Sequence, residues 1–595
     1  MSLLDALRQC EQGPRTLDDA LGRTLLRLDP GTGGEVAAAA ALASLAVHAG
    51  HAAFDPADPS QLVPGEVRWP PAADWRRALA ASRWVSTPAA PDEASPADVP
   101  LVLEDGLLYL RRYREYERRL AARLRALAAA RPQAPDAGAI APVLEALFPP
   151  GGSDPLQALA ARSALDRALL LVTGGPGTGK TTTIARLLVL LVAAAALAGR
   201  EPPRIALAAP TGRAAERMAG SLRAAVERLR GLPGIEPAWL QALPDGASTV
   251  HRLLGTRRDS TLFRHDATNP LRHDVVVVDE ASMVDLPLMC KLAEAVPGHA
   301  RLVLLGDPDQ LPSVEAGDVL AAICGASGDL GAGDGGRPAA SAGPLHGHRV
   351  HLQRGYRQAE SLELAPLAAA IREGGAEQVL TLLRSGSLDG IGFHEGNADP
   401  LGHAGSGLLE HWRGLARAGD PAQALGRVDE VRLLVALRQG PQGTQALNAR
   451  IAEYLAGPRP PAHFHGQLLL VTRNSYRHGL FNGDVGICLD DGSGRLVAWF
   501  PGSRADAPRA FQPGALPPHE SAFAMTVHKA QGSEFDRVWL QLPAVDNRVL
   551  SRELLYTAVT RARRRLDVAG SAAVLEAALQ RHVVRVSGLA ARLNG

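Results

Sequence analysis

A glycine-rich loop between an apolar strand and a helix constrains this chain more than any other feature. The run LLLVTGGPGTGKTTTIARLL fits the pattern GxxxxGK[ST] at residues 174–181, in the strand–loop–helix context that the pattern requires. Glycines let backbone N–H groups turn toward a phosphate, and the helix N-terminus adds the positive end of its dipole. We therefore predict that the phosphates of a nucleotide bind to Gly174, Gly175, Pro176, Gly177, Thr178, Gly179, Lys180, Thr181 and Thr182.

The second half of the predicted site follows the apolar run VVVV at residues 275–278. Asp279 would hold Mg²⁺ through water, Thr181 would ligate the same ion through its hydroxyl, and Lys180 would reach the β- and γ-phosphates. Glu280 would polarise the attacking water. The alternative for the two carboxylates is a solvated pair at a strand end. With the phosphate loop upstream, they indicate a site that hydrolyses ATP with Mg²⁺.

Short apolar runs alternate with helical patterns through the middle of the chain. Runs such as VVVVDE and LVLLGD are apolar at successive positions, so both faces of each strand are expected to be buried. This pattern predicts an α/β fold with a doubly wound parallel sheet. The expected strands of this sheet are 168–173, 205–210, 275–279 and 302–306.

Composition suggests how the chain is divided. Residues 107–127 mix tyrosines with arginines, which indicates a charge-laced surface helix or, alternatively, a docking surface for a partner. Short β-like runs rich in Gly and Pro at about 459–521 predict a small β-barrel inserted in a second α/β domain. The expected division is a helical N-terminal domain at 1–130, a linker at 131–155, a first α/β domain at 156–350 that ends in a mobile loop at 325–347, and a second α/β domain at 351–595.

Charge and cysteine usage limit the possible partners and compartments. With 63 basic and 62 acidic residues the net charge is +1, so any contact with nucleic acid must come from a local groove. The four cysteines form no CxxC pair, and neither a metal cluster nor a disulfide framework is expected. The N-terminus does not resemble a signal peptide and no apolar run is long enough to span a bilayer. We therefore expect a cytoplasmic protein with no membrane partner.

An amide and two arginines point beyond simple nucleotide binding. The run LVLLGDPDQLPS places Gln310 just beyond a strand, where its amide could sense the γ-phosphate. Further along, GYRQ offers Arg357 and AVTRARRRL offers Arg561. Two arginines from a second domain that close on a nucleotide held by the first would couple hydrolysis to domain closure. For Arg561, which lies in an arginine run, a solvated helix face is the alternative.

The ordered set of motifs resembles that of superfamily 1 helicases. GGPGTGKTTT, APTGRAAERM, STVHRLLG, VVVVDEASMVD, GDPDQLPSVEAGDVL, GYRQ, TVHKAQGSEFD and LYTAVTRARRRL occur in this order and resemble motifs I, Ia, Ib, II, III, IV, V and VI. Within the superfamily the chain is most similar to the RecD family, the α subunits of exodeoxyribonuclease V (the RecBCD complex), in VEAGDVL, LRQGPQGTQALN, HGLFNGDVGICL and AMTVHKAQGSEFD. The resemblance implies two RecA-like motor domains, an SH3-like insertion in the second, and 5′→3′ polarity.

The resemblance also implies roles for individual residues. Gln157 matches the residue that reads adenine, and an amide can pair with the N6 and N7 edge of that base. Glu534 matches a position that couples DNA to the nucleotide, beside Gln531 and Gly532. The implied DNA contacts are Pro210, Thr211, Arg213, His251, Thr526, His528 and Lys529. Of these, Thr211 and His528 could instead be ordinary loop or core residues.

The resemblance implies an ATP-dependent 5′→3′ DNA helicase subunit that acts on DNA ends in recombinational repair, with RecB-like and RecC-like partners. No cluster of Asp, Glu and Lys outside the ATPase motifs suggests a nuclease, so that activity is expected from the RecB-like partner. Two alternatives stay open. One is a stand-alone helicase of the same 5′→3′ branch, and the other is a DNA-end-binding scaffold whose ATPase switches conformation without translocation.

Overall fold

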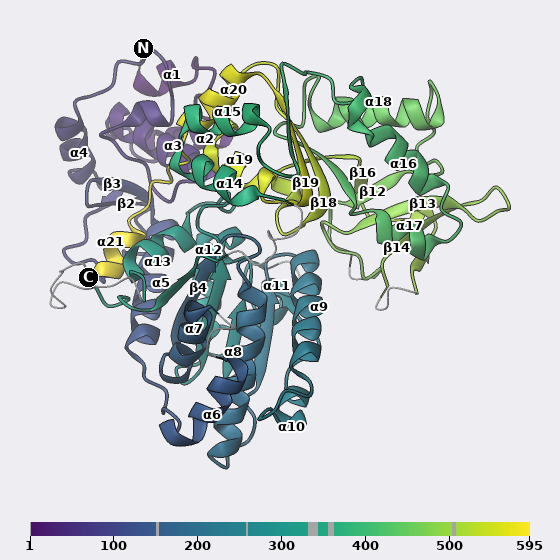
Figure 1. The fold of residues 1–595 in the computed structure, drawn as a ribbon. Coiled ribbons are helices and arrows are strands. Elements are labelled where there is room, and N and C mark those ends of the chain that lie inside the picture. The colour runs from purple at the N-terminus through teal and green to yellow at the C-terminus, as the bar shows by residue number, and fades with distance from the viewer. Residues whose placement is uncertain are drawn as a thin grey trace.

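The computed structural model describes residues 2–149, 154–257, 260–330, 343–354, 362–475, 477–502 and 507–595. In this part of the chain two parallel sheets lie side by side, and an antiparallel sheet and a smaller N-terminal sheet flank them (Figure 1). The predicted α/β fold with parallel sheets is confirmed.

The first parallel sheet has six strands in the order β6-β5-β7-β8-β4-β9. All four apolar runs expected to be strands lie in it. Val275 and Val277 pack into the core on one face, while Val276 and Val278 pack into the core on the other, which explains the absence of polar alternation. The strands are β4 (Leu169–Gly174), β5 (Ile205–Ala209), β6 (Ser248–Thr249), β7 (Val275–Val278), β8 (Arg301–Gly306) and β9 (Arg349–Leu352).

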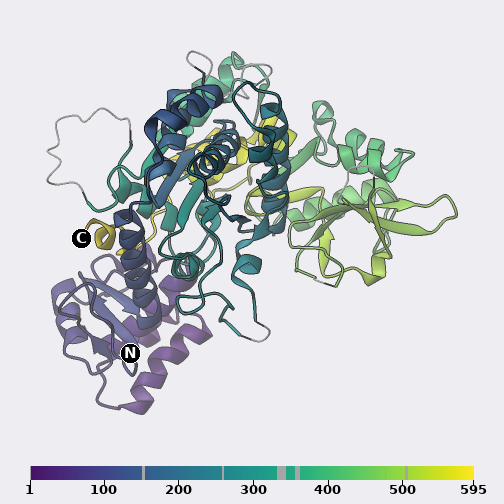
Figure 2. The same ribbon diagram turned by 90° about the horizontal axis from the view of Figure 1, so that it is seen from below.

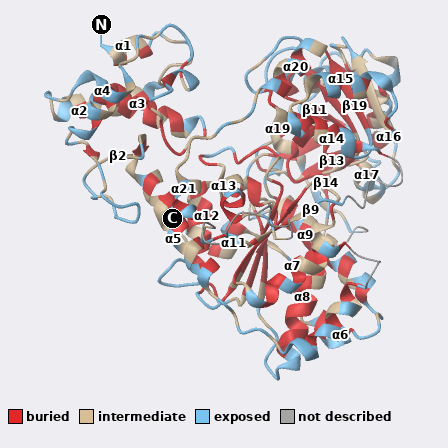
Figure 3. Ribbon diagram, turned by 60° about the vertical axis from the view of Figure 1, so that its left-hand side comes forward, coloured by how far each residue is buried: buried red, intermediate tan, exposed pale blue. Residues whose placement is uncertain are grey.

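Helices cover both faces of the first sheet, whose strands are buried between them (Figure 3). One face packs against α6 (Ala137–Leu147), α7 (Pro155–Asp166), α8 (Lys180–Leu197), α9 (Gly212–Leu229) and α10 (Pro237–Gln241). The other packs against α5 (Arg111–Ala129), α11 (Val250–Leu254), α12 (Leu286–Ala295), α13 (Val319–Ser327) and α21 (Leu589–Asn594). By length and composition alone α8 could cross a membrane, but it is 67% buried inside the fold, so packing against the sheet accounts for its apolar sequence.

The second parallel sheet has five strands in the order β10-β19-β18-β11-β17. They are β10 (Ile391–Glu395), β11 (Val431–Val435), β17 (Ala524–Thr526), β18 (Phe535–Gln541) and β19 (Ala562–Gly570). Its helices are α14 (Leu364–Glu373), α15 (Ala376–Ser385), α16 (Leu408–Ala416), α17 (Pro421–Arg427), α18 (Thr444–Ala456), α19 (Arg552–Val559) and α20 (Ala572–Gln580).

A five-stranded antiparallel sheet is inserted between α18 and β17, in the order β15-β14-β13-β12-β16. One face has a small core of its own that includes Leu469 and Phe500, whereas Leu468 and Ile487 join the core of the second sheet. The strands are β12 (Leu468–Val471), β13 (Val485–Asp490), β14 (Leu496–Phe500), β15 (Arg509–Phe511) and β16 (His519–Ser521).

The N-terminal region contains a sheet as well as the expected helices. Helices α1 (Leu3–Leu7), α2 (Thr16–Leu28), α3 (Gly34–His48) and α4 (Ala72–Ala80) precede strands β1 (Val85–Ser86), β2 (Leu101–Glu104) and β3 (Leu107–Leu110). The interpretation of residues 107–127 as a surface helix is wrong. Its first residues form β3, and the side chains of Arg114 and Glu117 in α5 are fully buried.

The C-terminal segment returns to the N-terminal region, so that both chain ends lie on the same side of the molecule (Figure 2). Arg592 of α21 pairs with Glu104 and lies 3.5 Å from a carboxylate oxygen of Glu117. Ser587 donates a 2.6 Å hydrogen bond to Glu117. A charged network buried in the protein therefore joins residues far apart in sequence.

Two segments differ from the simplest expectation. Residues 131–155, expected to be a linker, contain α6, whose Ile140, Val143 and Leu147 lie in the core of the first sheet. The expected loop at 325–347 begins inside α13, and its residues 331–342 lie outside the described part of the chain. Just before α13, the N–H of Gly317 donates a 2.9 Å hydrogen bond to the carbonyl of Gly50.

Candidate active site

The phosphate loop lies between β4 and α8. Gly177 and Gly179 have φ values of 79° and 85°, which side chains with a Cβ rarely adopt, and Gly179 is the N-cap of α8. The ammonium of Lys180 donates to the carbonyls of Gly174 (2.5 Å) and Gly175 (3.0 Å). The loop therefore holds its lysine at the N-terminus of a helix, which is an anion-binding position.

The two predicted carboxylates follow β7, which β8 separates from β4 in the first sheet. Asp279 accepts a 2.8 Å hydrogen bond from the N–H of Glu280. Burial raises the pKa of Asp279 above its ordinary value, and the charge of Glu280 raises it further. Burial also acts to raise the pKa of Glu280, but the positive charges of Arg217, Arg561 and Lys180 outweigh it and hold that pKa below its usual range. The pair thus consists of one carboxylate that a cation would stabilise and one that is ionised.

A cavity of about 400 Å³ connects the phosphate loop with the second sheet. Besides the loop itself, the predicted residues Asp279, Glu280, Gln310, Glu534 and Arg561 line it. Its walls also include Met218, Ser221, Asp307, Arg217 and Arg228. The structure therefore brings together most of the residues that the sequence assigned to ATP; Gln157 does not line the cavity, and Arg357 lies outside the described residues.

Arg561 is buried between the two sheets. Its guanidinium donates to the side-chain oxygen of Gln310 (2.8 Å) and to the carbonyls of Ser533 (3.2 Å) and Thr557 (3.0 Å). The solvated-face interpretation of Arg561 is wrong, because the side chain is only 1% exposed. The arginine thus connects the second sheet to the residue that follows β8 in the first.

Neighbouring contacts reinforce this connection. The hydroxyl of Tyr556 donates to Asp307 (2.9 Å), and the N–H of Leu311 donates to the hydroxyl of Thr557 (2.8 Å). The amide of Gln531 donates to the carbonyl of Leu311 (3.0 Å). Each of these bonds joins the segment that follows β8 to a residue of the second half of the chain, and Asp307 lines the cavity.

Gln157 and Arg357 are the exceptions among the predicted ATP residues. Gln157 is 3% exposed, and its amide nitrogen donates to the carbonyl of Thr178 at 3.4 Å. It therefore contacts the back of the phosphate loop from α7. Arg357 lies outside the described residues.

The residues predicted to contact DNA follow the carboxyl ends of strands in both sheets. Pro210 and Thr211 follow β5, and the hydroxyl of Thr211 accepts from the N–H of Ala214 (3.2 Å) as the N-cap of α9. Near β6, the ring of His251 makes an edge-to-face contact with Phe263 (5.8 Å between centroids). All three therefore lie near the sheet edge that also carries the phosphate loop.

In the second sheet, Thr526 ends β17, and its hydroxyl accepts from the N–H of Lys529 (3.3 Å). His528 is half-buried, and burial, assisted by the charge of Arg585, lowers its pKa below the usual value. The imidazole is therefore a neutral hydrogen-bonding group near pH 7.

Both predicted DNA-binding cations are paired with carboxylates. Arg213 forms a 2.6 Å ion pair with Asp429, which lies between α17 and β11, and Lys529 pairs with Glu520. Each must change partner before it can bind a phosphate.

Arg217 and Asp307 line the cavity and Tyr556 contacts Asp307, although no sequence pattern singled these residues out. Arg217 in α9 pairs with Glu280, and Asp307 accepts hydrogen bonds from Gln310 (3.1 Å) and Tyr556. Arg217 lies inside the quoted run APTGRAAERM, but the direction in which a helical side chain points depends on how the helix packs.

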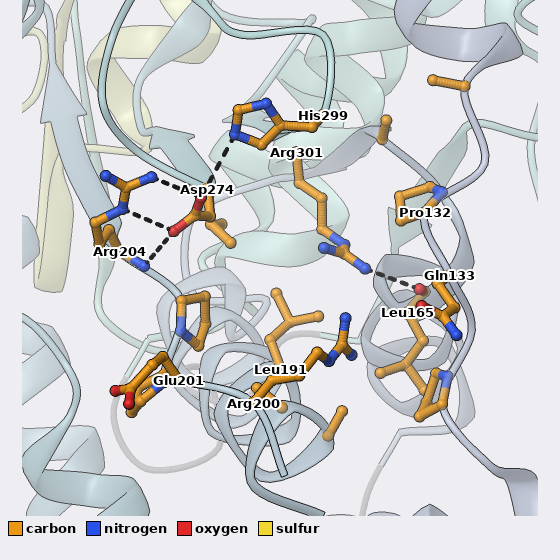
Figure 4. A pocket seen from close by; sticks show the side chains of 18 of the residues that line it. Pro132, Gln133, Leu165, Leu191, Arg200, Glu201, Arg204, Asp274, His299 and Arg301 are labelled. Atoms are coloured by element: carbon orange, nitrogen blue, oxygen red, sulfur yellow. Dashed lines mark hydrogen bonds and ion pairs between the residues drawn. The ribbon is translucent and has the colours of Figure 1, made fainter. Parts of the chain in front are cut away.

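A larger cavity of about 870 Å³ lies at the opposite edge of the first sheet, where its parallel strands begin (Figure 4). There Arg204 pairs with Asp274 (3.0 Å), and Arg301 donates to the carbonyls of Ala164 (2.8 Å) and Leu165 (3.0 Å). Its lining residues include no glycine loop and no paired carboxylates. The smaller cavity is therefore the candidate active site.

Comparison with known families agrees with this site. The AAA domain family matches residues 157–316, the UvrD-like helicase C-terminal domain matches 521–568, and the RecBCD enzyme subunit RecD, N-terminal domain, matches 12–109. The first match covers the phosphate loop, Glu280 and Gln310, and the second covers Arg561.

Individual relatives of the chain are also RecD proteins and a RecD2 helicase. RecBCD enzyme subunit RecD of Mycolicibacterium smegmatis is 40% identical, over 100% of this chain and 99% of the relative. The RecD subunit of Mycobacterium tuberculosis is 42% identical over 89% of this chain and 86% of its own length. The ATP-dependent RecD2 DNA helicase of Deinococcus radiodurans is 32% identical to this chain. The aligned part covers 69% of this chain and 48% of that protein. The chain therefore belongs to the RecD family of ATP-dependent DNA helicases.

Proposed function

We propose that this chain is the 5′→3′ motor subunit of a RecBCD-type helicase–nuclease that acts on double-strand DNA ends in recombinational repair. The observation that carries the proposal is the buried contact of Arg561 with Gln310 at the nucleotide cavity. The second half of the chain supplies this arginine to a nucleotide that the first sheet would hold. Hydrolysis would therefore depend on closure between the two halves.

In the proposed reaction the phosphate loop and Lys180 bind ATP, and Glu280 accepts a proton from the attacking water. The water oxygen forms a bond to the γ-phosphorus while the bond to the bridging oxygen breaks, giving ADP and inorganic phosphate. Arg561, with Arg357, stabilises the charge that develops on the transferred group.

Mg²⁺ fits the residues present, because Asp279 is a buried carboxylate whose pKa is raised by burial and by Glu280, and a cation would offset both. Thr181 and Asp279 would hold the ion, which would supply positive charge to the phosphates. Gln157 would select ATP by its amide, and Glu534 would report the state of the cavity to the DNA contacts.

For translocation, one DNA strand would cross the carboxyl ends of both sheets. The first sheet would contribute Pro210, Thr211, Arg213 and His251, and the second Thr526, His528 and Lys529. Contacts of this kind grip the backbone independently of sequence, as a motor requires. Each cycle of closing and reopening would advance the motor along the strand.

Residues 156–350 and 351–595 would be the two RecA-like motor domains, with an SH3-like insertion at about 459–521. Residues 1–130 would dock a RecC-like subunit, and a RecB-like subunit would supply the nuclease. The match of residues 12–109 to the RecD N-terminal domain supports this arrangement. The protein would act in the cytoplasm.

Substitution Lys180→Gln tests the motor. Removing the cation that reaches the β- and γ-phosphates should abolish both ATP turnover and unwinding of a duplex with a 5′ tail. Circular dichroism and the unfolding temperature should match those of the unaltered protein. Retained unwinding would contradict the proposal.

The likeness to RecD2 keeps a stand-alone helicase as the second candidate. Co-expression with RecB-like and RecC-like chains decides between the two. A stable heterotrimer whose 5′→3′ unwinding needs all three chains supports the subunit, whereas an isolated monomer with full activity supports the stand-alone enzyme.

A further inference from the structure

Arg217 lies in the active-site cavity and has no role in the mechanism above. It belongs to α9, its side chain is 26% exposed, and its guanidinium pairs with the carboxylate of Glu280. The same arginine also lines the adjoining cavity, between α9 and the antiparallel sheet. It therefore lies between the nucleotide cavity and the cavity that Arg213 lines.

The backbone of Glu280 is in an unusual conformation. Its φ is 52°, and among the described residues the one other non-glycine residue with a positive φ is Asp105. A glutamate held in this region costs free energy, which the surrounding contacts must offset. The ion pair with Arg217 is one such contact, so the carboxylate is held where it lies.

A carboxylate paired with a guanidinium is a poor acceptor for the proton of water. The γ-phosphate of ATP carries more negative charge than one carboxylate and offers bidentate oxygens, which suit a guanidinium. A nucleotide in this cavity therefore competes with Glu280 for Arg217.

Helix α9 also connects Arg217 with the predicted DNA contacts. Thr211 caps its N-terminus, and Arg213 pairs with Asp429 across the two sheets. From Thr211 to Arg217 is six residues, which is about 9 Å along the helix axis. A strand that draws Thr211 or Arg213 toward its phosphates thus moves the helix that carries Arg217.

We propose that Arg217 is a positioning residue that restrains Glu280, and that binding of ATP and of a DNA strand at the α9 N-terminus transfers the guanidinium away from it. The inference rests on the proposed function, because it explains how DNA would stimulate ATP hydrolysis. In the protein without DNA, the restraint on Glu280 slows ATP hydrolysis that is not coupled to movement along a strand.

The test compares Arg217→Gln with the unaltered full chain in steady-state ATPase assays, with and without single-stranded DNA. We expect the DNA-free kcat to rise by roughly tenfold, which is less than the roughly 100-fold or more that a general base contributes in full, and the stimulation by DNA to fall by the same factor. Arg217→Lys, which keeps the charge but not the planar fork, should lie between the two. Arg223→Gln is the matched control, since Arg223 lies on the same helix and donates to the carbonyl of Asp245 (2.7 Å) outside the cavity.

A double substitution distinguishes restraint of Glu280 from general damage to the helix. In a Glu280→Gln background the Arg217 substitution should change nothing.

Unchanged DNA-free turnover in Arg217→Gln, with loss of turnover in Lys180→Gln, would overturn the inference and leave the proposed function intact. Loss of turnover in Arg217→Gln with and without DNA, in a folded protein, would also overturn it, because hydrolysis would then require Arg217 and not be restrained by it. If Arg217→Gln does not fold, Arg217→Lys decides by the same comparison. Retained unwinding in Lys180→Gln would instead remove the proposed function itself.

Discussion

Individual side chains connect the two halves of the active site, and Arg561, which donates to Gln310, is one of them. It is 1% exposed and donates to Gln310, Ser533 and Thr557. A lysine carries the same charge but cannot present several donors in one plane. The geometry of the guanidinium is therefore as important as its charge.

Substitution Arg561→Lys should lower kcat by about 100-fold or more with a smaller change in KM, because the lost donors act on the developing charge. ATP titration of the DNA-stimulated rate measures both constants. Arg565→Lys is a suitable control, since Arg565 is half exposed and pairs with Asp567 away from the cavity. A change confined to KM would mean that Arg561 binds ATP without assisting hydrolysis.

The sequence predicted which residues lie in the active-site cavity better than it predicted which residues they contact. The glycine loop, the carboxylates after β7, Gln310 and Arg561 are short motifs whose chemistry fixes their place at strand ends, and all lie in one cavity. Arg217 was not predicted, because neither composition nor spacing tells which way α9 is rotated on the sheet. The pairing of Arg213 with Asp429 depends on closure between two sheets, which no local pattern encodes.

At the level of helices and strands, apolar runs buried on both faces were the most reliable signal. The four expected strands appear as β4, β5, β7 and β8, whereas the N-terminal sheet and α6 were not expected. Strands β2 and β3 are four residues each, and their partners across the fold, such as Arg592, are hundreds of residues away. Such short elements depend on tertiary contacts that a local pattern does not contain.

Helix α21 should stabilise the N-terminal sheet. Glu104 and Glu117 are buried, and Arg592 is their partner from the C-terminal segment. Arg592→Ala leaves two carboxylates without that cation and should lower the free energy of unfolding by about 3–5 kcal/mol. Hydrogen exchange of the β2 and β3 amides should be faster in this variant.

The matched control for this prediction is Arg77→Ala. Arg77 and Asp74 form an ion pair whose side chains are 77% and 57% exposed, so the change should be within about 0.5 kcal/mol. Equal exchange rates in Arg592→Ala and the unaltered protein would contradict a stabilising role for α21.

For the molecule as a whole, the contact between the two halves of the chain and the proposed contact with DNA involve the same cation. Arg213 pairs with Asp429, and the charge of that arginine helps to hold the pKa of Asp429 below its ordinary value against the effect of burial. Opening this pair would release Arg213 toward DNA. The motor would then exchange an internal ion pair for a contact with the strand.

Asp429→Asn should therefore tighten binding of single-stranded DNA by several-fold at low salt. The slope of log K against log salt should steepen by up to about 0.7, the value for one added phosphate contact on a single strand. Fluorescence anisotropy of a labelled oligonucleotide over a salt series measures both quantities. Asp399→Asn is the control, because the Asp399–Arg450 pair (2.8 Å) is about half exposed and lies within the second half of the chain. Weaker binding in Asp429→Asn would show that the pair organises the DNA path.

The hydrogen bond between Gly317 and Gly50 links the ATP site to the N-terminal region. Gly317 is seven residues beyond Gln310, while Gly50 lies at the end of α3 in the N-terminal region. A movement of the Gln310 segment that reaches Gly317 during turnover would either displace the N-terminal region or break this bond. The same bond works in the opposite direction: a protein bound to the N-terminal region would change the rate of ATP hydrolysis without contacting the ATP site.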